Sequence, residues 1–391
     1  MADRILTTHV GSLPRPERVV TQLFAQDSGL NYDAAQFDTV MQSEVNDVVA
    51  RQVQAQVDVV SDGEMSKISY ATYIRHRLTG FELGEMPRAV PLDLDDYPEF
   101  KERLAKLGAT PKYHRPICTG PIAVKDLSAL HQDIANLKAA CVRAAQPGQP
   151  PVRAFMNSAS PGVIAVFQPN KYYASREQYL QALADAMATE YETIVAAGLD
   201  LQIDAPDLAM GRHIQFRDVD DAEFLRNARM QVEALNHALR NIPAERVRMH
   251  VCWGNYEGPH HRDIGMDKII DVVLSAKPAT VLFEGANPRH AHEWEVWAKA
   301  GRENRIPDHK ILAPGVLDTV NNFIEHPRLV AQRLLTYANI VGRDRVMAAS
   351  DCGFGTFAGF GAIHPPICYA KLASMAEGAR MASDELWKRT A

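Results

Sequence analysis

The stretch from Ser175 to Asp204, SREQYLQALADAMATEYETIVAAGLDLQID, contains the alternation of helix and strand that decides the fold. Ser175 and Gln178 have the spacing of a capping box, and apolar residues then follow at steps of three and four, as on the buried face of a helix. Gly198 stands where a helix often ends. The run 200–204 that follows has strand character and ends in the carboxylate of Asp204.

The same alternation of strand-like and helical segments extends along the whole chain. Helical periodicity recurs over 221–239 and 327–340, and the second of these segments has a proline in its first turn. Several strand-like runs are apolar on both sides of the alternation, which is typical of parallel strands buried on both faces. The strand-like runs are 5–12, 57–64, 115–124, 153–166, 200–204, 246–253, 280–284, 311–318 and 345–352.

Repeated strand-then-helix order predicts parallel strands joined by right-handed crossovers. We therefore predict an α/β fold, a (β/α)₈ TIM barrel that uses the whole chain, 1–391, as a single domain. Because there are more strand candidates than barrel positions, we place the run 115–124 outside the barrel, in a hairpin or cap. An open doubly wound sheet is disfavoured because no Gly-x-Gly-x-x-Gly fingerprint follows a strand.

A long, proline-rich segment interrupts the alternation between Gly80 and Pro116. Connections of this length without secondary structure of their own are uncommon within a compact domain. We expect residues 80–116 to form an inserted excursion from the barrel, which would serve as a lid or as an oligomer contact.

Composition and charge exclude several classes of protein. Lys and Arg number 42 against 48 Asp and Glu, and the net charge of -6 leaves no basic stripe for a nucleic acid or an anionic membrane. No apolar run approaches the roughly 20 residues of a membrane span, and the N-terminus lacks the apolar core of a signal peptide. The cysteines are few and scattered, which argues against a disulfide framework. We expect a cytoplasmic enzyme for small molecules, with a homo-oligomer left open.

Polar side chains gather at the predicted carboxyl ends of the strands, where the active site of such a barrel lies. In the run 246–253, His250 and Cys252 are two residues apart, so in a strand both side chains point to the same face. A nitrogen beside a sulfur is half of a zinc site. For an isolated His-x-Cys pair, a packed strand with a buried thiol is the simpler alternative.

Two further strand ends supply the ligands that a zinc site would still lack. Glu284 follows the apolar run 281–283, where a carboxylate is costly unless it is paired or metal-bound. Cys352 ends the last strand, before a glycine-rich turn. Glu284 as a helix cap or salt-bridge partner, and Cys352 as a small core residue, stay open. One histidine, two cysteines and one glutamate form a ligand set that Zn²⁺ accepts, so zinc is the predicted cofactor.

A series of motifs in fixed order indicates a family. The motifs are Thr7-Thr8-His9-Val10-Gly11-Ser12-Leu13-Pro14, Asp62-Gly63-Glu64, Gln202-Ile203-Asp204, His250-Val251-Cys252, Phe283-Glu284, Pro314-Gly315-Val316-Leu317-Asp318 and Ser350-Asp351-Cys352-Gly353. With them the chain resembles, nearly end to end, the C-terminal catalytic domain of cobalamin-independent methionine synthase. The resemblance implies a zinc ion held by His250, Cys252, Glu284 and Cys352. It also implies a thiol amino acid bound by Gly11, Ser12, Glu64 and Asp204.

Departures from the family pattern concern the alkyl donor. The family's folate-binding glutamate falls near Met210, its general-acid histidine falls on Val320, and its Arg-Cys folate motif is absent. The runs 252–261 and 286–290 resemble instead a single-barrel branch of the family. That branch includes epoxyalkane:coenzyme M transferase and core methionine synthases with a non-folate methyl donor. A polyglutamyl methylfolate donor is therefore doubtful.

The predicted chemistry is attack of a zinc-bound thiolate on an electrophilic alkyl carbon, with a small thiol and an alkyl donor as partners. The thiolate is the useful nucleophile, and zinc deprotonates a coordinated thiol. Glu64 and Asp204 are the anions that an α-ammonium group requires, so we predict methyl transfer to a homocysteine-like thiol. One alternative is an epoxide-opening thiol transferase, with Arg212 or Arg289 holding a sulfonate. Another is a metal-free lyase resembling uroporphyrinogen decarboxylase, with Asp204 catalytic.

Two further residues are candidates for catalytic roles. Asp318 is a polar group at the end of the run 311–318, near the expected metal. His260 stands beside His261 in the loop after the zinc strand, and histidine suits acid–base catalysis because it titrates near neutrality. A histidine doublet in a loop is more often simply solvated.

Overall fold

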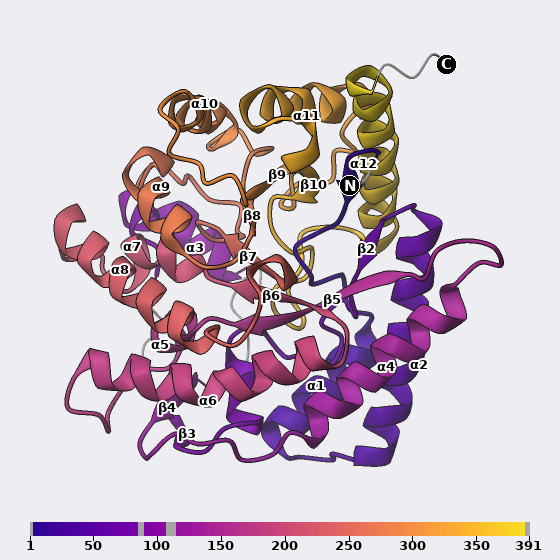
Figure 1. Ribbon diagram of the computed structural model, residues 1–391. Coiled ribbons are helices and arrows are strands. Elements are labelled where there is room, and N and C mark those ends of the chain that lie inside the picture. The colour runs from indigo at the N-terminus through magenta and orange to yellow at the C-terminus, as the bar shows by residue number, and fades with distance from the viewer. Residues whose placement is uncertain (1–2, 85–89, 107–114, 388–391) are drawn as a thin grey trace.

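Eight parallel strands form the sheet at the centre of the molecule (Figure 1). The structure is a computed structural model that describes residues 3–84, 90–106 and 115–387. The sheet confirms the predicted (β/α)₈ TIM barrel. In the order in which neighbours pair, its strands are β1 (Leu6–Thr7), β10 (Met347–Ser350), β9 (Ile311–Leu317), β8 (Thr280–Phe283), β7 (Val247–Val251), β6 (Asp200–Asp204), β5 (Arg153–Ala159) and β2 (Val59–Val60).

The first strand of the chain lies between the last strand and the second, and this arrangement nearly closes the barrel. On one side, β1 pairs in parallel with β10. On the other side, the main-chain N–H of Asp58 donates to the Thr7 carbonyl at 3.2 Å. The Thr8 hydroxyl also donates to the Val59 carbonyl, at 3.0 Å. The N-terminal segment therefore joins the two ends of the sheet.

Helices surround the sheet and connect one strand to the next (Figure 1). None of the helices in the described residues is both long and apolar enough to cross a membrane. The α-helices are α1 (Glu17–Ser28), α2 (Ala34–Gln54), α3 (Pro98–Lys106), α4 (Ser128–Ala144), α5 (Pro161–Phe167), α6 (Arg176–Ala196), α7 (Gly211–Ile214), α8 (Asp221–Ala238), α9 (Met266–Ser275), α10 (Trp294–Arg302), α11 (Pro327–Val341) and α12 (Pro365–Leu386). Short 3₁₀ helices are η1 (Thr72–His76), η2 (Leu92–Asp96), η3 (Pro206–Leu208), η4 (Ala244–Arg246), η5 (Ala291–Glu293) and η6 (Arg343–Arg345).

The helices predicted from periodicity are confirmed as α6, α8 and α11. At the start of α6 the Ser175 hydroxyl accepts the main-chain N–H of Gln178 at 3.2 Å, which satisfies one of the free N–H groups of the first turn. After its end, Gly198 has φ +90°, a conformation that glycine adopts without strain.

The strand predicted over 153–166 is too long. This run divides in the structure into β5 and α5. The Ser160 hydroxyl accepts the N–H of Val163 at 2.9 Å, and Pro161 occupies the first turn, where a missing N–H costs nothing. Residues 161–166 are buried. The prediction failed because a short buried helix and a buried strand have the same apolar composition.

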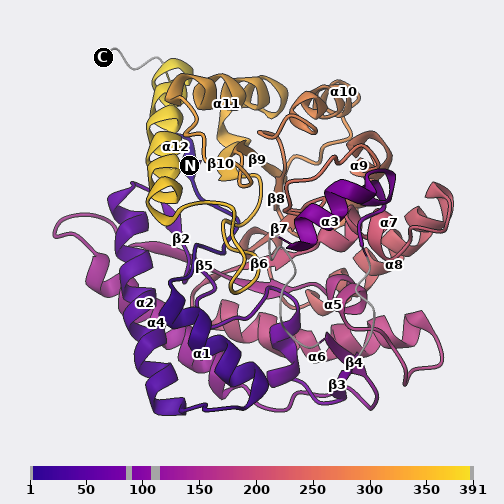
Figure 2. The ribbon, with the colours of Figure 1, turned by 180° about the vertical axis from the view of Figure 1, so that it is seen from behind.

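A hairpin and a helix lie outside the barrel sheet, between β2 and β5 in the chain. β3 (Phe81–Gly84) pairs with β4 (Arg115–Cys118) as an antiparallel ribbon, so the run 115–124 contributes no barrel strand, as predicted. In Figure 2 α3 lies in front of the barrel. Residues 85–89 and 107–114 of the predicted excursion lie outside the described residues. A role of 80–116 as a lid or oligomer contact stays a prediction.

The 3₁₀ helix η2 contacts the loop that follows β7. Oδ2 of Asp93, in η2, accepts the Tyr256 hydroxyl at 2.6 Å and the main-chain N–H of His260 at 2.8 Å. Asp93 is fully buried. The segment between the hairpin strands is therefore attached to the side of the barrel where the strands end.

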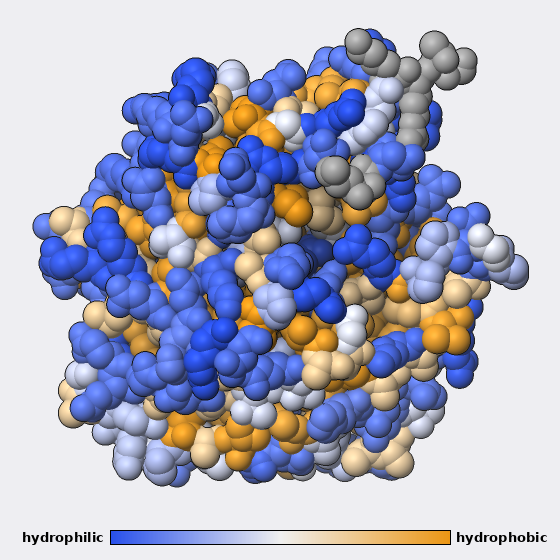
Figure 3. All heavy atoms as spheres, viewed as in Figure 1, coloured by the Kyte–Doolittle hydropathy of each residue, from blue (hydrophilic) through white to orange (hydrophobic). Residues whose placement is uncertain are grey.

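The opposite side of the barrel, where the strands begin, contains a cavity lined by both charged and apolar residues. Its volume is about 260 Å³. Hydrophilic residues predominate around the centre of the face shown in Figure 3. Arginines line much of the cavity: Arg4, Arg153, Arg246, Arg248 and Arg343.

Candidate metal and substrate site

His250 and Cys252 lie at the carboxyl end of β7, and both are buried. Neither ring nitrogen of His250 makes a well-formed hydrogen bond within the described structure, although the ring lies near the main chain of Leu282. Burial, together with the charge of Arg248, lowers the pKa of His250 to about 3. The ring is therefore neutral, which is the form of histidine that binds metal ions.

Cys352, just after β10, brings a second sulfur to the same place. The Sγ atoms of Cys252 and Cys352 are 3.9 Å apart, and both cysteines are free. The ligand atoms of His250, Cys252 and Cys352 all lie within 4.8 Å of one another. In a tetrahedral site, zinc–sulfur bonds of ~2.3 Å place two sulfurs about 3.8 Å apart, so this separation fits a shared zinc ion. The structure thus brings together three of the four side chains predicted as ligands.

Thiolates at this place require a cation beside them. The neighbouring Cys352, burial and the Glu284 carboxylate raise the pKa of Cys252 well above its usual range. A divalent ion would reverse this effect, because a coordinated thiol loses its proton. The neutral imidazole, the sulfur separation and the need for positive charge show that the residues present fit a zinc ion.

Glu284, predicted as the fourth ligand, follows β8 and is buried, but its oxygens lie outside the group of atoms within 4.8 Å. Its Oε1 accepts the main-chain N–H of Trp253 at 2.9 Å. Its Oε2 accepts the side-chain amide of Asn287 at 2.6 Å. Burial raises the pKa of Glu284. These contacts are neither those of a helix cap nor those of a salt bridge, the two alternatives considered for this residue.

Asp351 organises the turn after β8. Its Oδ1 accepts the main-chain N–H groups of Gly285 and Ala286, both at 2.8 Å. Its Oδ2 accepts the main-chain N–H of Asn287 at 2.7 Å. Because Asp351 directly precedes Cys352, one carboxylate joins the turn after β8 to the loop that carries the second sulfur. The sequence reasoning quoted this residue within a motif but gave it no role.

Gly11 and Ser12 lie beside the loop that carries Cys352. The Ser12 carbonyl accepts the N–H of Phe354 at 2.8 Å. Gly11 has φ +145°, and a Cβ at this position would lie 2.3 Å from Oδ1 of Asn157. Only glycine therefore allows this turn to approach the Asn157 amide.

Glu64 and Asp204 are neighbouring buried carboxylates. The Asp204 carboxylate accepts the amides of Asn157 and Gln202, each at 3.0 Å, whereas Oε2 of Glu64 has no partner among the described residues. Glu64 also has φ +56°, a strained conformation for a residue other than glycine. Burial, and then repulsion from Asp204, raise the pKa of Glu64 to about 8, and burial raises that of Asp204 to about 6. A positively charged group would relieve both effects.

The two predicted catalytic residues, Asp318 and His260, make their side-chain hydrogen bonds within their own loops. Asp318 accepts the main-chain N–H of Val320 at 2.8 Å through Oδ1 and the Asn321 amide at 2.5 Å through Oδ2. His260 is largely buried, and its ring nitrogens contact Asp263 and the Tyr256 carbonyl. The expectation of a solvated histidine is therefore wrong for His260. Catalytic roles for Asp318 and His260 stay predictions, which these hydrogen bonds do not favour.

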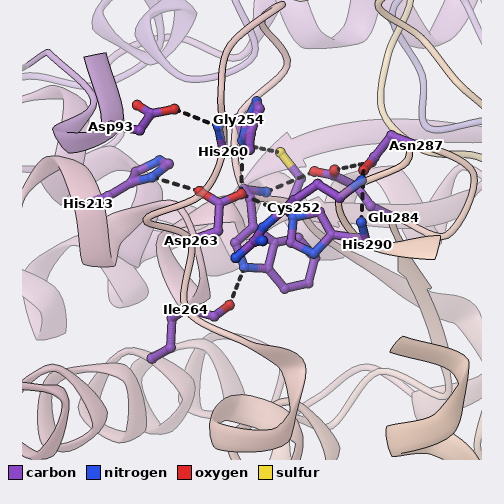
Figure 4. A network of polar contacts seen from close by, with 12 residues as sticks. Asp93, His213, Cys252, Gly254, His260, Asp263, Ile264, Glu284, Asn287 and His290 are labelled. Atoms are coloured by element: carbon purple, nitrogen blue, oxygen red, sulfur yellow. Dashed lines mark hydrogen bonds and ion pairs between the residues drawn. The ribbon is translucent and has the colours of Figure 1, made fainter. Parts of the chain in front are cut away.

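Asp263 is the main residue that sequence reasoning missed. Figure 4 shows its carboxylate among His213, His260 and His290, close to Glu284 and Cys252. The only local signal is its position three residues after His260. The other two rings come from α7 and from the loop after β8, which are distant in the sequence, so no sequence pattern could have assembled the group.

Known proteins resemble this chain along nearly its whole length. A sequence profile of the family described as cobalamin-independent synthase, catalytic domain, matches residues 5–88. A methionine synthase of Saccharolobus solfataricus is 25% identical over 98% of this chain and 96% of its own length. A methionine synthase of Sulfurisphaera tokodaii is 23% identical over 97% of this chain and 93% of its own. The chain is thus similar to the cobalamin-independent methionine synthase family.

Solved structures of methionine synthases share the fold of this chain. A B12-independent methionine synthase from a Shewanella species, in complex with selenomethionine, matches with a TM-score of 0.73 at 18% identity, covering 98% of this chain and 99% of that one. A putative vitamin-B12 independent methionine synthase from Listeria monocytogenes gives a TM-score of 0.65 at 15% identity, covering 97% and 98%. The matching profile and relatives confirm the resemblance read from the motifs and support an enzyme. They do not favour the epoxide-opening or decarboxylase-like alternatives.

Proposed function

We propose that this enzyme is a zinc-dependent methyltransferase that methylates the sulfur of a homocysteine-like amino acid. One observation above all supports the proposal: His250, Cys252 and Cys352 bring their ligand atoms within 4.8 Å of one another from two strands. Glu284 is the proposed fourth ligand. The relatives named methionine synthase support the same reaction.

Zinc bound by these residues would supply the positive charge that keeps a coordinated substrate thiol deprotonated and nucleophilic. The chain contributes two thiolates, one carboxylate and a neutral imidazole. Such an anionic ligand set leaves a substrate sulfur richer in electrons than a set of neutral histidines would. Glu284 is the ligand suited to give way to substrate, because the Trp253 N–H and the Asn287 amide hold its carboxylate nearby.

Glu64 and Asp204 would hold the amino acid end of the substrate. Both carboxylates are buried and one oxygen has no partner, so an α-ammonium group would supply the missing charge and donors. A thiol with a sulfonate would require a cation instead. Arg212, one candidate for that role, bonds to Asp221 at 2.9 Å and to the Phe216 carbonyl at 3.1 Å. The carboxylates therefore favour an amino acid over a sulfonate.

The residues near the proposed zinc ligands argue against methylfolate as the methyl donor. Met210, near which the family's folate-binding glutamate falls, is buried, and its N–H donates to the Cys252 carbonyl at 3.1 Å. Val320 has no titratable proton at the position of the family's general acid. A donor whose leaving group needs no protonation fits these residues better.

Metal analysis of the purified protein tests the ligand set. We expect about one zinc ion per chain, and we expect Cys252→Ser and Cys352→Ser to lose it, because each removes a thiolate from the cluster. Cys141→Ser, at a partly exposed cysteine on α4, is the matched control and should keep the metal. The activity of both variants should fall by more than ~100-fold. Replacement of a residue that only orients a metal ligand costs up to about this much, and these variants remove a ligand itself. Folded, active wild-type protein without zinc would refute the proposal.

A panel of substrates tests the reaction itself. Homocysteine should be converted to methionine with methylcobalamin or another non-folate donor, and poorly with methylfolate. Coenzyme M with a simple epoxide serves as the competing pair. Turnover of that pair, with none of homocysteine, would show the epoxide-opening reaction instead.

A further inference from the structure

Asp263 is a buried carboxylate, 1% exposed, that meets three histidine rings, one from α7 and two from the loops after β7 and β8 (Figure 4). His260 Nδ1 and His290 Nε2 lie 2.8 Å and 3.0 Å from its Oδ2, and His213 Nδ1 lies 2.9 Å from its Oδ1. These rings form no metal-compatible group within the described part of the chain. They converge on the carboxylate itself.

The partners of His260 and His290 determine how these rings are protonated. The second nitrogen of His260 faces the Tyr256 carbonyl at 3.1 Å, and the second nitrogen of His290 faces the Glu293 carboxylate at 3.0 Å. Carbonyl and carboxylate oxygens only accept hydrogen bonds, so each ring donates from both nitrogens and carries a positive charge. Burial opposes this charge at His290, but the hydrogen bonds to Asp263 and Glu293 outweigh it and raise the pKa of His290 to about 10.

His290 connects this cluster to Glu284 by two routes. Its ring stacks on the indole of Trp253, with centroids 4.0 Å apart, and the main-chain N–H of Trp253 holds Oε1 of Glu284. Its main-chain N–H donates to Oδ1 of Asn287 at 3.0 Å, and the Asn287 amide holds Oε2 of Glu284. Each oxygen of the proposed fourth ligand therefore bonds to a residue that His290 contacts, and Asp351 also holds one of these residues, Asn287.

We propose that Asp263 is a positioning residue for the metal site, which clamps His290 against Trp253 and thereby sets the place of the Glu284 carboxylate beside the two sulfurs. This inference rests on the proposed function, because it takes Glu284 as a metal ligand. Asp263 acts through His290, Trp253 and Asn287. Its loss should weaken metal binding while the sulfur and imidazole ligands stay in place.

Asp263→Asn tests this role, because an amide presents a donor to rings that already donate. Zinc affinity, measured by competition with a chromogenic chelator, should fall by about 10–100-fold, as is usual for residues that orient metal ligands. The visible spectrum of the cobalt-substituted protein should shift as coordination by Glu284 changes. Asp185→Asn is the matched control, because Asp185 also bonds a histidine, His237 at 2.7 Å, but on the surface. It should leave both readouts unchanged.

Glu293→Gln provides a second test in case Asp263→Asn does not fold. It keeps the shape of the side chain and disturbs the same His290 ring from the other side, so zinc affinity should fall in the same direction. Folded variants that bind zinc as tightly as the wild type, with an unchanged cobalt spectrum, would overturn the positioning role alone. Wild-type protein that binds no zinc would refute the proposed function, and the positioning role with it.

Discussion

The two ends of the candidate site both require positive charge, but they are built from different groups. At the sulfur end, two thiols and a neutral imidazole lie within 4.8 Å of one another. At the other end, Glu64 and Asp204 are buried together, and one oxygen of Glu64 has no partner among the described residues. Sulfur and imidazole suit zinc, whereas a pair of carboxylates suits an ammonium group.

The two ends also differ in how firmly their carboxylates are held. Both oxygens of Glu284 accept hydrogen bonds, and the donors are fixed in turn by His290 and Asp351. Glu64 has strained backbone geometry and a free oxygen. The proposed zinc ion would thus meet a fixed carboxylate, whereas the proposed substrate would meet a carboxylate with an unpaired acceptor oxygen. We expect changes at one end to leave the other end intact.

Glu64→Gln should have the largest effect of the changes that test whether the two ends of the site act separately. It should raise KM for homocysteine by about 30-fold or more, because loss of one member of a buried charge pair costs about 2 kcal/mol or more. Zinc content of the same preparation should stay at the wild-type value. Steady-state kinetics and metal analysis measure the two quantities.

The control for this substitution is Glu44→Gln. Glu44 is also buried, but it lies on α2 and pairs with Arg18. Its replacement should leave KM unchanged. An unchanged KM in Glu64→Gln, or loss of zinc from that variant, would show that the two ends do not act separately.

Gly11→Ala tests the backbone that supports the carboxylate end. The added Cβ would lie 2.3 Å from the Asn157 amide, which bonds Asp204, so we expect destabilisation of about 1–3 kcal/mol, read as a lower Tm. Gly148→Ala is the control, because Gly148 also has a positive φ, +78°, but open space around it. Equal losses in the two variants would show that the clash with Asn157 contributes nothing.

The buried carboxylates also predict how stability changes with pH in the metal-free protein. The pKa of Glu64 is raised to about 8, so the folded chain keeps a proton that the unfolded chain loses above about pH 4.3. The contribution of Glu64 to stability therefore falls as the pH rises through this window. Relative to Glu64→Gln, which does not titrate, the wild type should lose up to about 1.4 kcal/mol of stability for each pH unit within this window.

Urea unfolding of both proteins in the presence of a chelator measures this difference. The free energy of unfolding should be compared at several pH values between about 5 and 8, the window set by the two pKa values. A difference that is constant, or one that favours the wild type at high pH, would contradict the protonated state of Glu64 in the folded chain.

The barrel could be predicted because most of its strands alternate with helices of clear periodicity. The run 153–166 was predicted wrongly, because the buried Ser160 that caps the helix and the proline after it were read as part of one continuous strand. The ribbon of β3 and β4 was foreseen only in part, since β3 has no strand-like alternation. The division into one domain, 1–391, with an excursion at 80–116 stays a prediction.

The site was predictable where the barrel itself determines position. His250 and Cys252 share a strand face by alternation, and Cys352 ends another strand, so these side chains follow from topology. Asp263 does not, because it lies in a loop and its partners converge only in the folded chain. For Asp318 the sequence predicted the position at the end of a strand correctly. Its two carboxylate oxygens, however, accept hydrogen bonds from its own turn.

The closing pair of strands has a consequence for how the enzyme is made. β10, which precedes Cys352, pairs with β1 at the other end of the polypeptide. Cys252 precedes Cys352 by 100 residues. During translation the growing chain therefore exposes one sulfur of the cluster long before the other exists. If the proposed zinc ion binds at this site, its full set of ligands exists only once Cys352 has been made, and a chain that stops before β10 would also lack the strand that pairs with β1.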